Sequence, residues 1–161
     1  MKTAVVYYSM SGNTELAAER IAAVLGADLI RLTPVKAYPD KGFRKFFWGG
    51  KSAVRGEKPA LEPFDFRAED YEQVILGTPI WAGTFAPPLR TFANRYRDAL
   101  AGKSLAFFAC MSGSGAEKAA AKLAECLGID AFAAALALID PKIKPDPDMD
   151  TKIEAFCAAL K

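Results

Sequence analysis

Residues 7–16 read YYSMSGNTEL, and this stretch decides the fold because it joins an apolar run to a helical pattern through small polar residues. The run Ala4–Tyr8 before it is continuously apolar, as a strand buried on both faces should be. The pattern after it has apolar residues at helical spacing from Ala17 to Leu25, and Gly26 follows where a helix C-terminal cap belongs. The stretch therefore predicts the first strand–loop–helix unit of a parallel sheet.

The loop in this stretch is rich in hydrogen-bond donors and carries no basic side chain. Ser9, Ser11 and Thr14 supply hydroxyls, Asn13 an amide, and Gly12 a flexible turn. A helix N-terminus adds free N–H groups and the positive end of a dipole, so neutral groups can hold a phosphate monoester. The missing lysine argues against a Walker loop, and GxGxxG is absent. The alternative is that serine and asparagine merely cap the helix.

Strand and helix patterns alternate along the rest of the chain. We expect a three-layer α/β fold with a five-stranded parallel sheet and helices on both faces. The other expected strands are Asp28–Leu32, Val74–Leu76, Leu105–Ala109 and Phe132–Ile139, and the other helical patterns run from Leu89 to Leu100, Ala120 to Leu127 and Ile153 to Leu160. Pro87 and Pro88 open the first of these helices, and Gly102 and Gly128 follow the first two.

A long segment, residues 33–71, interrupts this alternation between the second and third strands. It is too long for a bare loop in a compact domain, so we expect a helix near Phe43–Val54 within a single domain spanning residues 1–161. Lys36–Lys58 contains seven basic and two acidic residues, a local charge of +5 in a chain of net charge +2. A solvated face is the simplest explanation, and docking to an acidic redox partner is the alternative.

Composition restricts the function classes. A net charge of +2 is too small to indicate nucleic-acid or membrane binding. Cys110, Cys126 and Cys157 lie far apart without a CxxC pair, which suggests neither disulfides nor a metal site. We expect a cytoplasmic protein, as a monomer or weak homodimer. The chain has no histidine, which excludes acid–base catalysis by imidazole, and no residue is predicted to be catalytic.

The first loop resembles the phosphate loop of the flavodoxin family, whose pattern is S/T-x-S/T-G-x-T and whose ligand is FMN. The resemblance covers nearly the whole chain. Within the family, the chain is more similar to the small bacterial flavodoxin-like proteins than to flavodoxin itself. It implies the strand order 2-1-3-4-5, with the uninterrupted run Phe132–Ile139 suggesting the short form of the fold. It also implies FMN as the cofactor, bound by three loops.

The second and third loops follow the third and fourth strands, as GTPIWAGTFAPPL at 77–89 and CMSGSG at 110–115. Trp81 is an aromatic side chain that can stack on a flavin, although covering the end of the sheet is the alternative. The third loop by itself indicates only a helix cap. The residues expected to bind the cofactor are Ser9, Met10, Ser11, Gly12, Asn13, Thr14, Thr78, Pro79, Ile80, Trp81, Ala82, Gly83, Met111, Ser112, Gly113 and Gly115.

Two features depart from typical flavodoxins. Those proteins are strongly acidic, whereas this chain carries the basic segment. Their third loop usually supplies a second aromatic against the flavin, and here only Met111 stands near that position. Trp48, Phe47 or Tyr38 from the long insertion could supply it instead.

Three functions are compatible with these features. The favoured one is low-potential electron transfer, because apolar burial and a fixed phosphate disfavour added negative charge on a flavin. The second is an FMN-dependent NAD(P)H oxidoreductase acting on a quinone-type acceptor. The third is a binding module without flavin. The expected partner is accordingly a redox protein or NAD(P)H.

Overall fold

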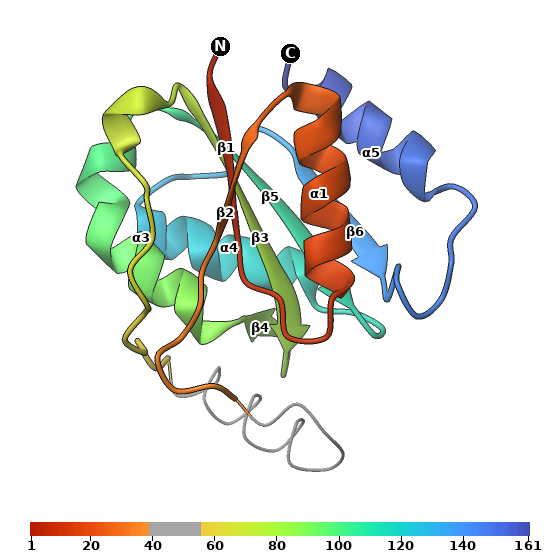
Figure 1. The fold of residues 1–161 in the computed structure, drawn as a ribbon, viewed down its shortest axis with the longest axis horizontal. Helices are drawn as coiled ribbons and strands as arrows, with labels where there is room; N and C mark the ends of the chain where they lie inside the picture. The colour runs from red at the N-terminus through yellow and green to blue at the C-terminus, as the bar shows by residue number, and fades with distance from the viewer. Residues whose placement is uncertain (39–55) are drawn as a thin grey trace.

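The computed structural model describes residues 1–38 and 56–161, and it has a parallel sheet at its centre (Figure 1). The parallel strands follow the order β2-β1-β3-β5-β6, which confirms the predicted order 2-1-3-4-5. A short strand that was not predicted, β4, pairs antiparallel with the end of β3. The strands are β1 (Thr3–Tyr7), β2 (Asp28–Arg31), β3 (Gln73–Trp81), β4 (Thr84–Phe85), β5 (Ser104–Met111) and β6 (Ala135–Ile139).

The register brings the carboxyl ends of the central strands to one edge. Tyr7 pairs with Gly77, and Gly77 pairs with Phe108. Beyond this row β3 and β5 stay paired as far as Pro79 and Cys110. The loops that follow β1, β3 and β5 therefore meet at the lower end of the molecule in Figure 1, opposite both termini. This is the edge at which open parallel sheets bind ligands.

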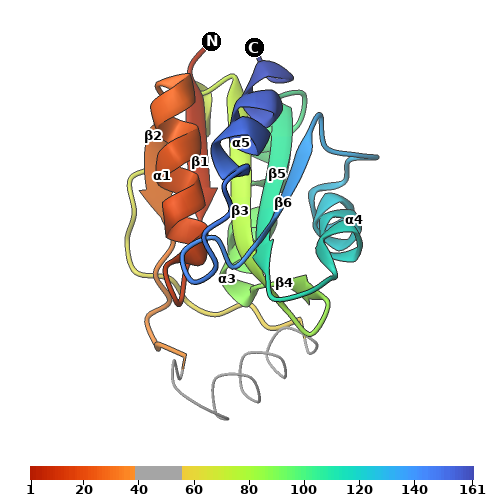
Figure 2. The same ribbon diagram turned by 90° about the vertical axis from the view of Figure 1, so that its right-hand side faces the viewer.

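Helices cover both faces of the sheet (Figure 2). Helices α1 (Asn13–Leu25) and α5 (Met149–Ala158) pack on one face, and α3 (Pro87–Leu100) and α4 (Ala116–Leu127) on the other. Each face buries its own cluster of apolar side chains, centred on Ile75 and Phe108 under α1 and α5, and on Leu76 and Phe107 under α3 and α4. The three layers follow from these two apolar faces.

Glycines and prolines lie at several of the helix ends. Gly26 and Gly128 have positive φ angles of 62° and 70° and cap α1 and α4, as predicted. Pro87 and Pro88 occupy the first turn of α3, where a missing N–H costs nothing. Gly102 lies one residue beyond the cap of α3, which is Ala101.

The strands differ from the expected runs in length and burial. β3 extends to Trp81, well past the predicted Val74–Leu76, because residues after Leu76 continue to pair with β5 and then with β4. β6 starts at Ala135 rather than Phe132, whose ring instead stacks on Phe107 at 5.4 Å. β2 and β6 are edge strands, and Ile139 is 49% exposed, so these two are not buried on both faces.

The two ends of the long insertion lie side by side. The Val35 N–H donates to the Ala60 carbonyl at 2.9 Å, and the Glu62 N–H donates to the Thr33 carbonyl at 2.7 Å. A single 3₁₀ turn, η1 (Ala68–Asp70), leads into β3. The helix predicted near Phe43–Val54 lies outside the described residues, as does most of the basic segment. Within residues 1–38 and 56–161, no helix has the length and apolar character needed to cross a membrane.

Candidate functional site

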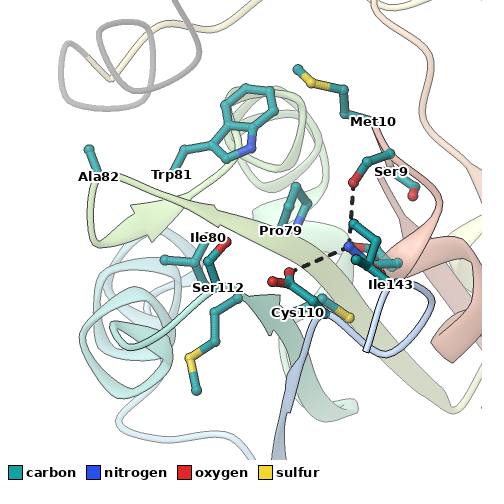
Figure 3. A pocket seen from close by; sticks show the side chains of 14 residues that line it. Ser9, Met10, Pro79, Ile80, Trp81, Ala82, Cys110, Ser112 and Ile143 are labelled. Carbon is teal, nitrogen blue, oxygen red and sulfur yellow. Dashed lines mark hydrogen bonds between the residues drawn. The ribbon is translucent and has the colours of Figure 1, made fainter. Parts of the chain in front are cut away.

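A cavity of about 490 Å³ opens where the loops after β1, β3 and β5 meet (Figure 3). Its volume lies within the range of roughly 300–1,000 Å³ that is usual for small-molecule sites. One wall comes from the first loop, and the opposite wall from the end of β3. The lining residues are Ser9, Met10, Ser11, Asn13, Thr14, Pro79, Ile80, Trp81, Ala82, Cys110, Met111, Ser112, Asp140 and Ile143.

Most of the residues predicted to bind a cofactor line this one cavity. The exceptions are four glycines and one threonine, which are not among the lining residues: Gly12, Thr78, Gly83, Gly113 and Gly115. Three lining residues were not predicted, namely Cys110, Asp140 and Ile143. Asp140 and Ile143 follow β6, so the rule that ligands meet the carboxyl ends of parallel strands was the signal that could have found them.

Ser9 has a structural role inside the first loop. Its Oγ accepts hydrogen bonds from the backbone N–H groups of Gly12 at 3.2 Å and Glu15 at 3.1 Å. The Ser9 side chain thus satisfies two N–H groups at the start of α1, in the way that a cap does. The capping alternative therefore describes Ser9 well, and only its hydroxyl proton remains available to a ligand.

Thr14 differs from Ser9 in the hydrogen bonding of its hydroxyl. Its Oγ1 is buried and makes no hydrogen bond of ordinary geometry with the residues that the structure describes, and the thiol of Cys110, a weak hydrogen-bonding group, lies near it. An unsatisfied buried hydroxyl is costly, by roughly 1–3 kcal/mol, and native proteins seldom leave one. As the first residues of α1, Asn13 and Thr14 also have N–H groups without an intrahelical acceptor. This corner of the cavity suits an anionic oxygen.

Asn13 connects the first loop to the segment after β6. Its Oδ1 accepts a hydrogen bond from the Lys142 backbone N–H at 2.9 Å, and its Nδ2 lies 3.5 Å from Asp140 Oδ1 and 3.5 Å from Ser11 Oγ. The side-chain amide is therefore largely used within the protein. The main role of Asn13 is therefore to hold the first loop against the segment after β6.

Trp81 stands at the opposite wall on a tight hairpin between β3 and β4. The two residues of its turn, Ala82 and Gly83, have positive φ angles of 50° and 73°, the pattern of a type I′ turn. The indole is half-buried and packs edge-on against the rings of Tyr38 at 5.2 Å and Tyr8 at 5.7 Å. These contacts hold the indole at the rim of the cavity (Figure 3).

Tyr38 therefore lies against Trp81 instead of covering the cavity. It lines a smaller neighbouring recess of about 190 Å³ with Tyr8 and Arg31, and it is absent from the lining of the main cavity. Met111 does line the main cavity and is half-buried. Phe47 and Trp48, the other candidates for a second aromatic wall, lie outside the described residues.

Gly77 and Thr78 shape the second loop without lining the cavity. A Cβ on Gly77 would lie 2.0 Å from Cζ of Phe108, so this glycine makes room for a core ring and not for a ligand. Thr78 is fully buried, where its Oγ1 accepts from the Ala86 N–H at 2.9 Å and donates to the Pro79 carbonyl at 2.8 Å. The Thr78 hydroxyl is therefore used within the protein, and Thr78 does not line the cavity.

The third loop contributes Met111 and Ser112 to the cavity. Gly115, at φ 110°, caps α4, and a Cβ there would lie 3.1 Å from both Gly83 Cα and Ile80 Cγ2. Gly115 therefore allows the second and third loops to pack together. Burial raises the pKa of the Cys110 thiol to about 12, against a smaller lowering effect of the neighbouring Thr14 hydroxyl. Cys110 is a protonated, unreactive part of the cavity floor.

Comparison with known proteins gives a family match and a set of similar folds. The family model described as flavodoxin matches residues 2–138. Similar solved structures include a flavoprotein in complex with FMN from Lactobacillus acidophilus NCFM, at 20% identity and TM-score 0.70, covering 94% of this chain and 97% of that one. Oxidised flavodoxin 1 from Bacillus cereus aligns at 20% identity and TM-score 0.62, covering 99% and 97% of the two chains. Two-electron reduced flavodoxin from Megasphaera elsdenii aligns at 16% identity and TM-score 0.62, covering 99% of each chain.

Proposed function

Because the chain belongs to the flavodoxin family, we propose that it binds FMN in this cavity and transfers electrons between redox partners. The cofactor supplies the redox chemistry, and the protein contributes binding, orientation and the electrostatic surroundings. The observation that carries the proposal is a single cavity with the N-terminus of α1 at one wall and Trp81 at the other.

The residues of the first wall suit the phosphate. The N–H groups of Asn13 and Thr14 are donors that need an acceptor, and so is the Thr14 hydroxyl, which makes no hydrogen bond of ordinary geometry within residues 1–38 and 56–161. Ser11 also lines this wall, and Ser9 can donate its remaining proton. A phosphate monoester has three acceptor oxygens, so it can satisfy several of these donors together.

The residues of the other walls suit the flavin ring. The Trp81 indole offers a flat aromatic face whose position is held by Tyr8 and Tyr38. Met10, Ile80 and Met111 make much of the remaining lining apolar. Such apolar surroundings disfavour added negative charge on a bound ring, which supports a role at low potential.

Flavin binding is tested by titrating the apoprotein with FMN and following the loss of flavin fluorescence. We expect a stoichiometry of one FMN per chain. Trp81→Ala should weaken FMN and riboflavin together by about tenfold or more, because the lost contact is with the ring that both share. Trp81→Phe keeps an aromatic face and should lose much less. If FMN is not bound by the unaltered chain, the flavin-free module becomes the better description.

Electron transfer is tested by stopped-flow mixing of the FMN-loaded chain. A carrier should reduce a one-electron acceptor such as cytochrome c rapidly after chemical reduction, and NADH or NADPH should bleach its flavin only slowly. Fast bleaching by either nucleotide would contradict the carrier role and support the NAD(P)H oxidoreductase.

A further inference from the structure

The segment after β6 brings a cation to a loop that has none of its own. The Lys142 side chain lies over Gly12, so that a Cβ built on this glycine would stand 2.7 Å from Lys142 Nζ and 3.0 Å from its Cδ. The Lys142 backbone is fixed at the same place, because its N–H donates to Asn13 Oδ1 at 2.9 Å. Its ammonium therefore lies beside the first turn of α1.

Among the residues that the structure describes, this ammonium has no acidic partner. In the described parts of the chain, no ion pair or hydrogen bond joins Lys142 Nζ to an acidic side chain. Arg31 is the contrasting case on the other side of the loop. It donates to Glu15 Oε2 at 2.7 Å and to the Ser9 carbonyl at 3.1 Å, so its charge is already paired.

The cavity wall also contains a negative charge that a phosphate would meet. Asp140 lines the cavity, and its carboxylate lies 3.5 Å from the Asn13 side-chain amide, close to the first loop. Two anionic groups at this corner repel each other. A cation from the same segment offsets that repulsion. Lys142 does not itself line the cavity, but its Nζ lies beside Gly12, between the lining residues Ser11 and Asn13 of the first loop.

We propose that Lys142 anchors the ligand's phosphate electrostatically and makes the site selective for FMN over riboflavin, an inference that depends on the proposed function. A charge pair near a protein surface changes a binding constant by about tenfold, and salt screens it. Lys142 lies beyond residue 138, where the match to the family model ends, so this anchor belongs to a part of the chain outside that match.

The test compares Lys142→Gln with Lys144→Gln by fluorescence titration with FMN and with riboflavin. Lys144 is a matched control, since it is an exposed lysine two residues away on the same segment, and the three atoms nearest to a Cβ built on Gly12 all belong to Lys142. Glutamine keeps the backbone N–H that binds Asn13, so the loops stay connected. Titrations at ionic strengths of about 0.01 M and about 1 M, where charges are screened over about 30 Å and about 3 Å, isolate the electrostatic part.

We expect Lys142→Gln to weaken FMN by about tenfold at low salt, to leave riboflavin unchanged and to flatten the salt dependence of FMN binding. Lys144→Gln should behave like the unaltered chain. The proposal is overturned if Lys142→Gln binds FMN normally, weakens both flavins equally, or matches Lys144→Gln. If the unaltered chain binds neither flavin, the proposed function itself fails, which is a separate result.

Discussion

Gly77 shows at the scale of one residue how the core restricts the second loop. It pairs with Tyr7 on one side and Phe108 on the other, in the middle of the sheet. The Phe108 ring is fully buried and occupies the position that a Cβ on residue 77 would take. The glycine is therefore required by packing within β3, although in the sequence it begins the stretch 77–89 that is rich in small residues.

Gly77→Ala should lower the free energy of unfolding by about 3 kcal/mol, because the added methyl group overpacks the core. Urea denaturation followed by circular dichroism measures the loss. Phe108→Leu in the same chain removes the overlapping ring atoms and should recover part of the stability, which keeps the test meaningful if the single variant does not fold. Additive losses in the double variant would contradict this explanation.

The β3–β4 hairpin shows at the scale of an element how a short antiparallel pair positions a binding residue. The hairpin is tied at its base by the Thr78 hydroxyl, which bonds the Ala86 N–H and the Pro79 carbonyl. A second threonine of the hairpin, Thr84, is also buried but has no partner for its Oγ1 within the described residues. The two threonines therefore form a natural comparison.

Thr78→Val should destabilise the chain by roughly 1–3 kcal/mol, because it leaves the buried Ala86 N–H without an acceptor. Thr84→Val, of the same size and chemistry, should be neutral or slightly stabilising, since no hydrogen bond is lost. Urea midpoints measured on both variants decide the matter. Equal losses would show that the Thr78 hydrogen bonds contribute nothing beyond the removal of a hydroxyl.

At the scale of the whole molecule, buried titratable side chains make the free energy of unfolding depend on pH. Burial raises the pKa of Tyr7 and Cys157, and it raises the pKa of Cys110 and Tyr71 to about 12, in Tyr71 together with its hydrogen bond to Asp28. Between about pH 9 and 12 the folded chain thus holds protons that the unfolded chain releases. The free energy of unfolding is unaffected by these groups below that range and falls as pH rises through it.

Urea denaturation at intervals from pH 7 to 11 should therefore show a decline in stability above about pH 9. Cys110 alone accounts for a loss of about 3 kcal/mol at pH 11, given its pKa of about 12 in the folded chain. Cys110→Ala lacks the titrating thiol, so its stability should fall less steeply over this range. Parallel curves for the two chains would contradict the assignment to Cys110.

The sequence by itself determined the alternation of strands and helices, the strand order through a family resemblance, and the loops that meet at the site. These features depend on local patterns: continuous apolar runs, helical spacing, and the glycines and prolines at element ends. The first loop and Trp81 were found for the same reason, since each carries its chemistry within a few consecutive residues. Both line the cavity.

Only the tertiary structure decided what each of these residues does. Thr78 and Ser9 both bind backbone groups, and only Ser9 also lines the cavity. Gly77 makes room for a ring from another strand. Lys142 reaches Gly12 across a sequence separation that no local pattern spans. The reason is that packing of the sheet brings distant segments together, and these segments set the burial and the charge around each residue. The first loop has no cation in its own sequence, but Lys142 lies beside it in the folded chain.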